Sequence, residues 1–362
     1  MFLTPIRIRR ALQASFRIVV FCFLCGITTS TLAQVGNVVT INPPQPDVNL
    51  IPLGFNNLGD VFGHFTSGNK AFKYSNGVFT VITPPGAIQT HLTAMNNLGD
   101  VVGYFENTNI QVLGFHYRNG TFTFITAPAP GHSPHPERIT DTGEIYGTYF
   151  LNPVGEYLFR FRNGAFTTLT PDGARFVRLN GVTAKGVLWG GWISHSNGSE
   201  LPFIHRDGAF SFFSSPFEDE WIAGINDSDL LVGGYIDHGF VNNDDRRRGF
   251  ILKDGQYIPI FILGEDVGFV PMGINNSGVV YGTFAGGLGF KYYTSDHTYD
   301  VIEPPGRGKI TLSGMNNDGA AYGTYFDSNN LEHAFKFTGG NFTTINGPRR
   351  KKNYRHGNEP IR

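Results

Sequence analysis

The 362 residues include 47 Gly and 33 Phe, whereas charged residues make up only 16%. Valine, threonine and aromatic residues stand between clusters of Gly, Asn and Pro, a composition typical of short strands joined by tight turns. The 28 Lys and Arg against 29 Asp and Glu give a formal net charge of −1, which excludes the strong positive charge of a typical nucleic-acid-binding protein.

The first 33 residues have the features of a secretory leader. Four arginines stand at or before Arg17, the run from Ile18 to Ile27 is apolar, and small residues follow up to Ala33. The apolar run is too short to span a bilayer, and no later stretch approaches the roughly 20 apolar residues of a membrane helix. We therefore expect cleavage after Ala33, secretion to the extracellular space or periplasm, and no transmembrane segment.

Cleavage would change the chemistry of the chain. Both cysteines, Cys22 and Cys25, lie in the leader, so the mature chain would have no disulfide and no thiol nucleophile. Without the leader arginines the net charge becomes −5, and without the basic tail of residues 349–362 it becomes −10. We expect the tail to be disordered, although it could also touch acidic polymers or a membrane surface.

A phrase of eleven residues, of the type MNNLGDVVGYF, recurs through the remaining chain. Its seven copies begin 40 to 49 residues apart, at Phe55, Met95, Ile139, Val182, Ile225, Ile274 and Met315. A period in the forties is typical of propeller blades or of helical-pair repeats. A second shared phrase follows each copy, as in AFKYSNGVFTVI from Ala71, where aromatic residues alternate and Asn-Gly marks a two-residue hairpin turn. This chemistry favours strands over helices.

Each repeat therefore predicts four antiparallel strands, and the Asn-Asn-x-Gly motif forms the turn between the first two. Successive apolar residues, as at Val101 and Val102, give such a sheet two apolar faces. Stacking seven sheets around an axis covers both faces. We predict an all-β fold, a seven-bladed β-propeller of four-stranded antiparallel blades over residues 34–348.

The segment Asn37–Pro44 resembles the last strand of the final repeat, Asn341–Pro348. It could pair with the last blade and clasp the ring, or it could remain a spare edge. We favour the clasp, because an unpaired edge strand invites association with other chains.

The stretch Glu332–Phe337, which reads EHAFKF, and the repeated Asn-Asn-x-Gly-x-x-x-Gly turns give the chain a resemblance to a known family. Over residues 37–348 the sequence resembles the HAF-type extracellular repeat family of bacterial secreted proteins. The resemblance implies a propeller-like fold and brings no activity and no catalytic residues with it.

The variable loops, between the second and third strands and between consecutive repeats, are where we expect binding. They supply the candidate ligand-binding residues His91, His132, His135, Glu137, Arg138, Trp221, Asp237 and His238. Two alternatives remain open: Trp221 could pack between blades, and the charged segment around Asp237 could be a solvated surface loop.

Catalytic and metal-binding motifs are not evident. The chain has no His-Glu-x-x-His, no Gly-x-Ser-x-Gly and no phosphate-binding loop, and the pair His132 and His135 falls short of a zinc site. We expect no cofactor and a monomeric, non-catalytic module that binds a glycan or a protein. The alternatives are a polysaccharide lyase or hydrolase on the same face, and a purely structural extracellular module.

Overall fold

We describe the protein from a computed structural model. The structure describes residues 50–65, 69–127, 132–151, 155–169, 174–194, 200–213, 215–217, 219–238, 245–262, 268–305, 308–327 and 332–345. These residues belong to one compact unit, Val35–Arg362. The expected leader, the clasp segment 37–44 and the basic tail lie outside the described residues.

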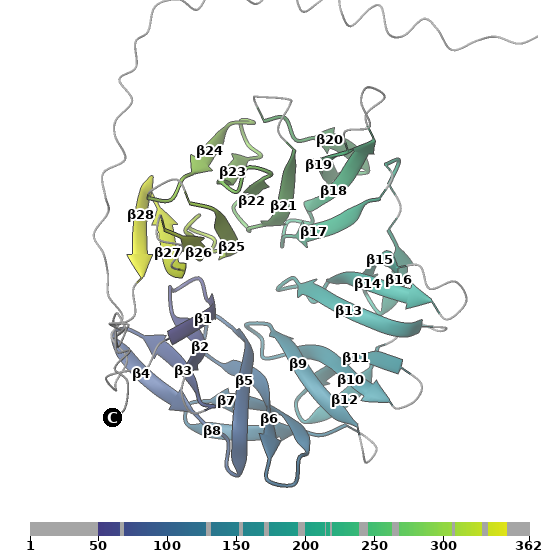
Figure 1. Cartoon of the computed structure of the whole chain (residues 1–362). Coiled ribbons are helices and arrows are strands. Elements are labelled where there is room, and N and C mark those ends of the chain that lie inside the picture. Colours follow the sequence, from purple (N-terminus) through teal and green to yellow (C-terminus); the bar gives the residue numbers. More distant parts are fainter. Residues whose placement is uncertain are drawn as a thin grey trace, which may run out of the picture. The chain divides into compact units, whose positions relative to one another are not determined.

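The described residues of this unit form seven four-stranded antiparallel sheets arranged in a ring, which confirms the predicted seven-bladed β-propeller (Figure 1). Within each sheet, the strands pair in the order in which they occur in the chain. The first strand of each blade lies at the central opening and contacts the first strands of both neighbouring blades. We call it the inner strand, and the fourth the outer strand.

The strands of blades 1 to 4 are β1 (Leu50–Phe55), β2 (Val61–Phe65), β3 (Ala71–Ser75), β4 (Val78–Ile82); β5 (Ala87–Met95), β6 (Val101–Asn107), β7 (Val112–Arg118), β8 (Thr121–Ile125); β9 (Ser133–Ile139), β10 (Ile145–Leu151), β11 (Gly155–Arg162), β12 (Ala165–Thr168); β13 (Ala174–Val182), β14 (Leu188–Ser194), β15 (Glu200–Arg206) and β16 (Ala209–Phe212). Those of blades 5 to 7 are β17 (Trp221–Ile225), β18 (Leu231–His238), β19 (Asp245–Lys253), β20 (Gln256–Pro259); β21 (Phe269–Ile274), β22 (Val279–Phe284), β23 (Gly289–Tyr293), β24 (Tyr299–Ile302); β25 (Ile310–Met315), β26 (Ala321–Phe326), β27 (Glu332–Thr338) and β28 (Asn341–Ile345).

The turns have the predicted chemistry. Between the third and outer strands of blade 1, Asn76 and Gly77 both adopt positive φ, 48° and 84°, as a two-residue hairpin turn of this type requires. Between the inner and second strands, the Asn56 side chain accepts hydrogen bonds from the backbone N–H groups of Leu58 and Asp60. We call this Asn-Asn-x-Gly turn the corner. The Asn56 side chain thus satisfies backbone N–H groups that have no partner in the sheet because of the turn.

One phenylalanine per blade anchors the packing between sheets. The third strands place seven of them in the core, none more than 1% exposed: Phe72, Phe115, Phe159, Phe203, Phe250, Phe290 and Phe335. Burial of each side chain contributes roughly 1.5 to 3 kcal/mol. Because a single sheet could not bury both of its faces, this free energy is gained only when neighbouring blades stack.

Every inner strand contains a β-bulge at the same place in the repeat. In blade 3, the bulged residue is Glu137, which is skipped between the pairs Arg138 with Tyr146 and Pro136 with Gly147. A bulge re-aims side chains locally. It therefore changes which residues of the inner strand face the central opening.

The corners are joined around the axis by hydrogen bonds that we call the corner circuit. In six of the seven blades, the second corner residue donates its backbone N–H to the side-chain oxygen of the equivalent residue in the next blade, as Asn57 does to Asn97 at 2.8 Å. The same bond closes the ring between blades 7 and 1, from the N–H of Asn317 to the side chain of Asn57 at 2.9 Å. The rings of Phe55 and Tyr322 also stack at this junction between blades 7 and 1, which we call the seam.

The outer strand of blade 7 is β28, from the same repeat as the other three strands of that blade. The predicted clasp falls on residues outside those described. Within the described part of the chain, no helix has the length and apolar character needed to cross a membrane.

Candidate functional site

The inner strands carry a row of equivalent residues, five positions before the first residue of each corner. In blade order this inner row is Ile51, His91, His135, Arg178, Trp221, Val270 and Thr311. Each pairs across to the second strand of its own blade: with His64, Tyr104, Thr148, Gly191, Gly234, Thr283 and Thr324, respectively. The four histidine, arginine and tryptophan side chains thus belong to consecutive blades, 2 to 5. One side of the ring is chemically different from the other.

Aromatic rings from three blades stack along this row. The ring of Tyr104 lies between those of His91 and His135, at centroid distances of 4.8 Å and 4.4 Å. His64 meets the His91 ring edge-on at 5.5 Å. We call these four residues the His-Tyr stack. Because the rings are shared between blades 1, 2 and 3, the stack exists only in the assembled propeller.

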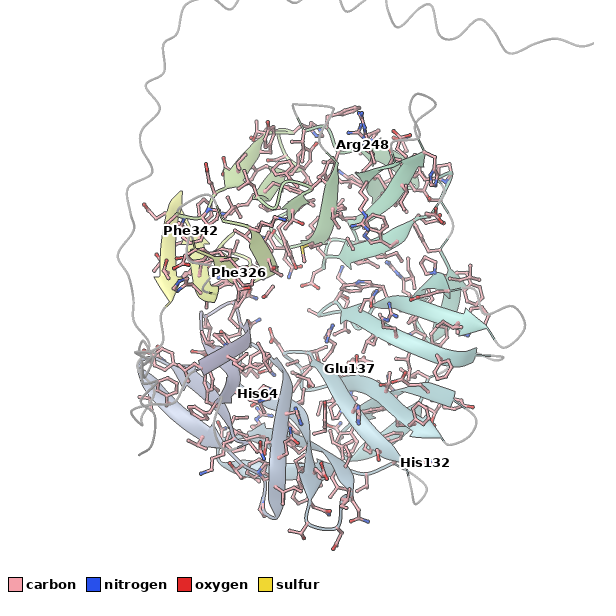
Figure 2. All side chains as sticks on the ribbon, in the orientation of Figure 1. His64, His132, Glu137, Arg248, Phe326 and Phe342 are labelled. Carbon is pink, nitrogen blue, oxygen red and sulfur yellow. The ribbon has the colours of Figure 1, made fainter. Side chains whose placement is uncertain are left out.

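A pocket of about 280 Å³ opens between blades 3 and 4, and we call it the blade 3–4 pocket. Its polar lining includes Glu137, Glu156, Glu200, Thr148 and Arg178, and its apolar lining includes Phe176. It adjoins the His-Tyr stack through Thr148, which pairs with His135 across the strands. The stack and the pocket are therefore neighbours in blade 3. Figure 2 shows Glu137 beside the central opening.

Hydrogen bonds and ion pairs fix the acidic groups of the pocket. The Thr148 hydroxyl donates to Glu137 Oε1 at 2.8 Å, and Arg178 pairs with Glu200 at 3.3 Å. Burial raises the pKa of Glu137 above its usual value, against smaller lowering effects of the Thr148 hydrogen bond and of Arg138. The buried carboxyl group of Glu137 therefore holds a proton more readily than the carboxyl group of a solvent-exposed glutamate does.

The histidines of the stack favour the neutral state. Burial lowers the pKa values of His64, His91 and His135 below the usual 6.5, and it outweighs the opposite effects of Glu106 on His91 and of Glu156 on His135. Neutral rings can stack on an apolar face and exchange hydrogen bonds with hydroxyl groups. Among the described residues, no group of three His, Cys, Asp or Glu side chains is arranged to hold a metal ion.

The structure places five of the eight predicted ligand-binding residues in strands near the opening, not in loops as expected. His91, His135, Glu137, Arg138 and Trp221 lie in β5, β9 and β17. The segment SPHPERI forms β9 despite its two prolines, because an inner strand has only one paired neighbour and proline is tolerated there. His91, His135 and Glu137 come together in the stack and pocket.

Arg138 instead bridges two blades. Its guanidinium donates to the carbonyl of Asn180 at 2.7 Å and to that of Glu137 at 2.8 Å. At the equivalent position six blades carry Gly or Ala: Gly54, Ala94, Gly181, Gly224, Gly273 and Gly314. Arg138 thus ties β9 to β13.

Trp221 has the packing role that the sequence left open. Its indole ring lies against Gly234, where a Cβ atom would collide with it, so a glycine is needed beside the large ring. Trp221 belongs to the inner row but fills space within its own blade. This geometry favours the packing alternative.

The remaining three residues lie apart from the stack. Asp237 and His238 belong to β18 rather than to a loop, because the ladder continues to the pairs with Arg246 and Asp245. Arg248 lies 3.9 Å from Asp237, and Asp219 lies 3.1 Å from His238. His132 packs on Tyr149 at a ring distance of 5.6 Å and lies on the outer part of blade 3 in Figure 2.

Sequence reasoning missed the stacking partners Tyr104 and His64 and the pocket residues Thr148, Glu156 and Arg178. A signal was present. When the repeats are aligned on their corners, His91, His135, Arg178 and Trp221 fall in one column, five residues before the first corner residue.

Similarity to known proteins supports the fold of this chain but does not identify its function. No family model matches the chain, and no curated protein matches it. Among solved structures, the β-propeller domain of the Trilobed protease from Pyrococcus furiosus, described as having an open velcro topology, is similar with a TM-score of 0.56 at 13% identity, over 83% of this chain and 95% of that one. The acylaminoacyl peptidase of Pyrococcus horikoshii gives 0.55 at 11%, over 86% and 54%.

A puromycin hydrolase, a serine-to-alanine mutant complexed with PGG, is also similar, with a TM-score of 0.55 at 12% identity, over 81% of this chain and 53% of that one. This chain therefore spans about half the length of the two larger enzymes. Likeness at such low identity establishes the β-propeller fold alone.

Proposed function

We propose that this protein is a secreted, non-catalytic binding module of the HAF-type repeat family. In this proposal it acts as a monomer and binds a glycan at the His-Tyr stack and the blade 3–4 pocket. The observation that carries the proposal is that the two features are neighbours: the stacked rings lie next to a pocket lined with carboxyl and hydroxyl groups.

This combination suits a sugar. The C–H face of a pyranose packs against aromatic surface, while its hydroxyl groups need hydrogen-bond acceptors and donors. Glu156 and the Glu137–Thr148 pair supply acceptors, and Arg178 supplies a donor. A cavity of about 280 Å³ is small for a drug-sized ligand and suits one sugar unit, with the neighbouring units on the stack.

A second function is favoured by one specific observation, the raised pKa of Glu137. A carboxyl group with a raised pKa can act as a general acid, and Glu156 in the same pocket could act as the base. The alternative is therefore a polysaccharide lyase or hydrolase that uses these two glutamates.

A glycan array probed with the mature chain tests the proposal, with Glu137→Gln and Asp237→Ala as the two variants. We expect binding of at least one glycan by the wild type, at least about tenfold weaker binding by Glu137→Gln because an acceptor oxygen is lost, and unchanged binding by Asp237→Ala, which lies outside the site. New reducing or unsaturated ends on the bound glycan would support the alternative that the protein is a polysaccharide hydrolase or lyase. If no glycan binds, the remaining alternative is a purely structural extracellular module.

A further inference from the structure

The corner circuit is interrupted at one blade. The second corner residue is Asn or Asp in six blades, namely Asn57, Asn97, Asp141, Asp227, Asn276 and Asn317, but in blade 4 it is Ala184. Ala184 still donates its N–H to Asp227 at 2.7 Å. It has no side-chain oxygen with which to accept the next bond, so the N–H of Asp141 has no acceptor among the described residues.

A second cavity, of about 510 Å³, surrounds this interruption on the axis of the propeller. It lies among the corners, and its lining shares no residue with that of the blade 3–4 pocket. One apolar residue of each blade, the residue before the corner, lines it, as Phe55, Met95 and Ile139 do. The six Asn and Asp side chains of the circuit also line it. We call this cavity the axial pocket.

The axial pocket retains hydrogen-bonding capacity after the circuit has formed. The side-chain NH₂ groups of Asn57 and Asn317 have no acceptor among the described residues, and neither has the N–H of Asp141. Asp141 and Asp227 each accept two hydrogen bonds from the circuit, through both carboxylate oxygens. A carboxylate has about four acceptor sites, so capacity for a hydroxyl donor remains.

The charge of the lining selects among ligands. Among the described residues that line it, none is Lys or Arg, whereas two are aspartates. An anionic ligand would meet these carboxylates without a compensating cation, which is unfavourable in a partly enclosed site. Donors, acceptors and an apolar floor together match a neutral, hydroxyl-rich molecule.

We propose that the axial pocket is a second binding site, which takes a neutral monosaccharide or the terminal sugar of a glycan at the gap left by Ala184. This inference is independent of the proposed function, since the two pockets are lined by different residues. A ligand hydroxyl there would accept from the N–H of Asp141, as a side-chain oxygen does at the other corners.

The test measures calorimetric and fluorescence titrations of the full chain with D-glucose, D-galactose, D-glucuronate and D-glucosamine. Trp189 lines the pocket and reports by fluorescence. Ala184→Asn is the decisive variant, because the new side chain completes the circuit and fills the gap. Lys185→Asn, at the next corner position, which is not part of the lining, is the matched control.

We expect a neutral sugar to bind to the wild type and to Lys185→Asn, and to bind at least about tenfold more weakly to Ala184→Asn. The melting temperature of Ala184→Asn should be equal to or above that of the wild type, which separates the effect from unfolding. Binding should persist in Glu137→Gln, so that the axial site is distinguished from the blade 3–4 pocket. Undiminished binding by Ala184→Asn, tighter binding of glucuronate than of glucose, or no binding of any sugar would overturn the proposal.

Discussion

At the scale of single residues, the His-Tyr stack couples ring packing to protonation. Burial disfavours the imidazolium form, and this lowers the pKa values of His64, His91 and His135. Protonation would place positive charges on neighbouring rings, since His91 itself lowers the pKa values of His64 and His135. The three histidines therefore stabilise the propeller only while they are neutral.

We predict that His91→Phe reduces the acid sensitivity of the fold. In the unfolded chain His91 takes up a proton near pH 6.5, whereas in the folded chain its pKa is lower. The contribution of His91 to the free energy of unfolding is therefore complete above about pH 6.5 and decreases as the pH falls below that value. Phenylalanine keeps a stacking ring but takes up no proton, so the loss between about pH 7.5 and about pH 5.5 should shrink.

Chemical denaturation at both pH values, with Tyr104→Phe as the control, measures this difference. The control alters the same stack without removing a histidine and should keep the wild-type loss. Glu137 acts in the opposite direction, because its raised pKa favours the folded state as the pH falls. The comparison between variants is therefore decisive, and an equal loss in His91→Phe and Tyr104→Phe would refute the prediction.

At the scale of the element, a glycine column sets the distance between the inner and second strands. A Cβ atom on Gly282 would collide with the backbone oxygen of Val270 on the inner strand. The equivalent glycines of the other blades face the carbonyl groups of the remaining inner-row residues in the same way. The bulge brings the two backbones this close, so the glycine column and the inner row depend on each other.

We predict that Gly282→Ala destabilises the protein by roughly 1 to 3 kcal/mol, because the neighbour that must move is backbone and not a flexible side chain. Gly286→Ala in the same blade is the matched control. A Cβ atom there meets nothing within 4 Å, so its effect should stay within about 0.5 kcal/mol. Denaturant unfolding of both variants gives the values. Equal stability of the two variants would mean that the strands can separate at little cost.

The same bulge explains why the fold could be predicted from the sequence but most of the site could not. The corners and the alternating third strands repeat in the sequence itself, so number of blades, strand order and turn chemistry follow from local rules. Alternation fails at Glu137, where one extra residue shifts the faces of β9. Strand β9 also continues through Pro134 and Pro136, so His135 and Glu137 lie in a strand and not in a loop as expected.

The contacts between blades are harder to predict from the sequence than the structure within one repeat. Tyr104 meets His135 only because β6 and β9 belong to adjacent blades. That distance depends on how tightly the sheets stack, which no spacing within one repeat reveals. The depth of the blade 3–4 pocket depends on the same quantity.

At the scale of the whole molecule, the seam between blades 1 and 7 differs from the other six interfaces. Every other pair of neighbouring blades is joined by the chain itself. Among the described residues, the seam is held by non-covalent contacts: the Phe55–Tyr322 stack and the hydrogen bonds of Asn316 and Asn317 to Asn57. If these contacts open, the two inner strands can separate without unfolding the rest of the ring.

We predict that Asn57→Ala raises local opening at the seam, whereas Asn276→Ala does not raise it within the ring, although Asn276→Ala removes more hydrogen bonds. Asn57→Ala removes the acceptor of Asn317 N–H at the seam. Asn276→Ala removes the acceptor of Asp227 N–H and the bond from its own NH₂ group to Asp227. Each lost bond costs about 1 kcal/mol. Only the seam lacks a covalent link to hold the blades together. Amide hydrogen exchange should therefore rise in β1 and β25 for Asn57→Ala, and remain near wild type in β17 and β21 for Asn276→Ala. Faster exchange at both interfaces, or at neither, would show that the seam opens no more readily than a covalently joined interface.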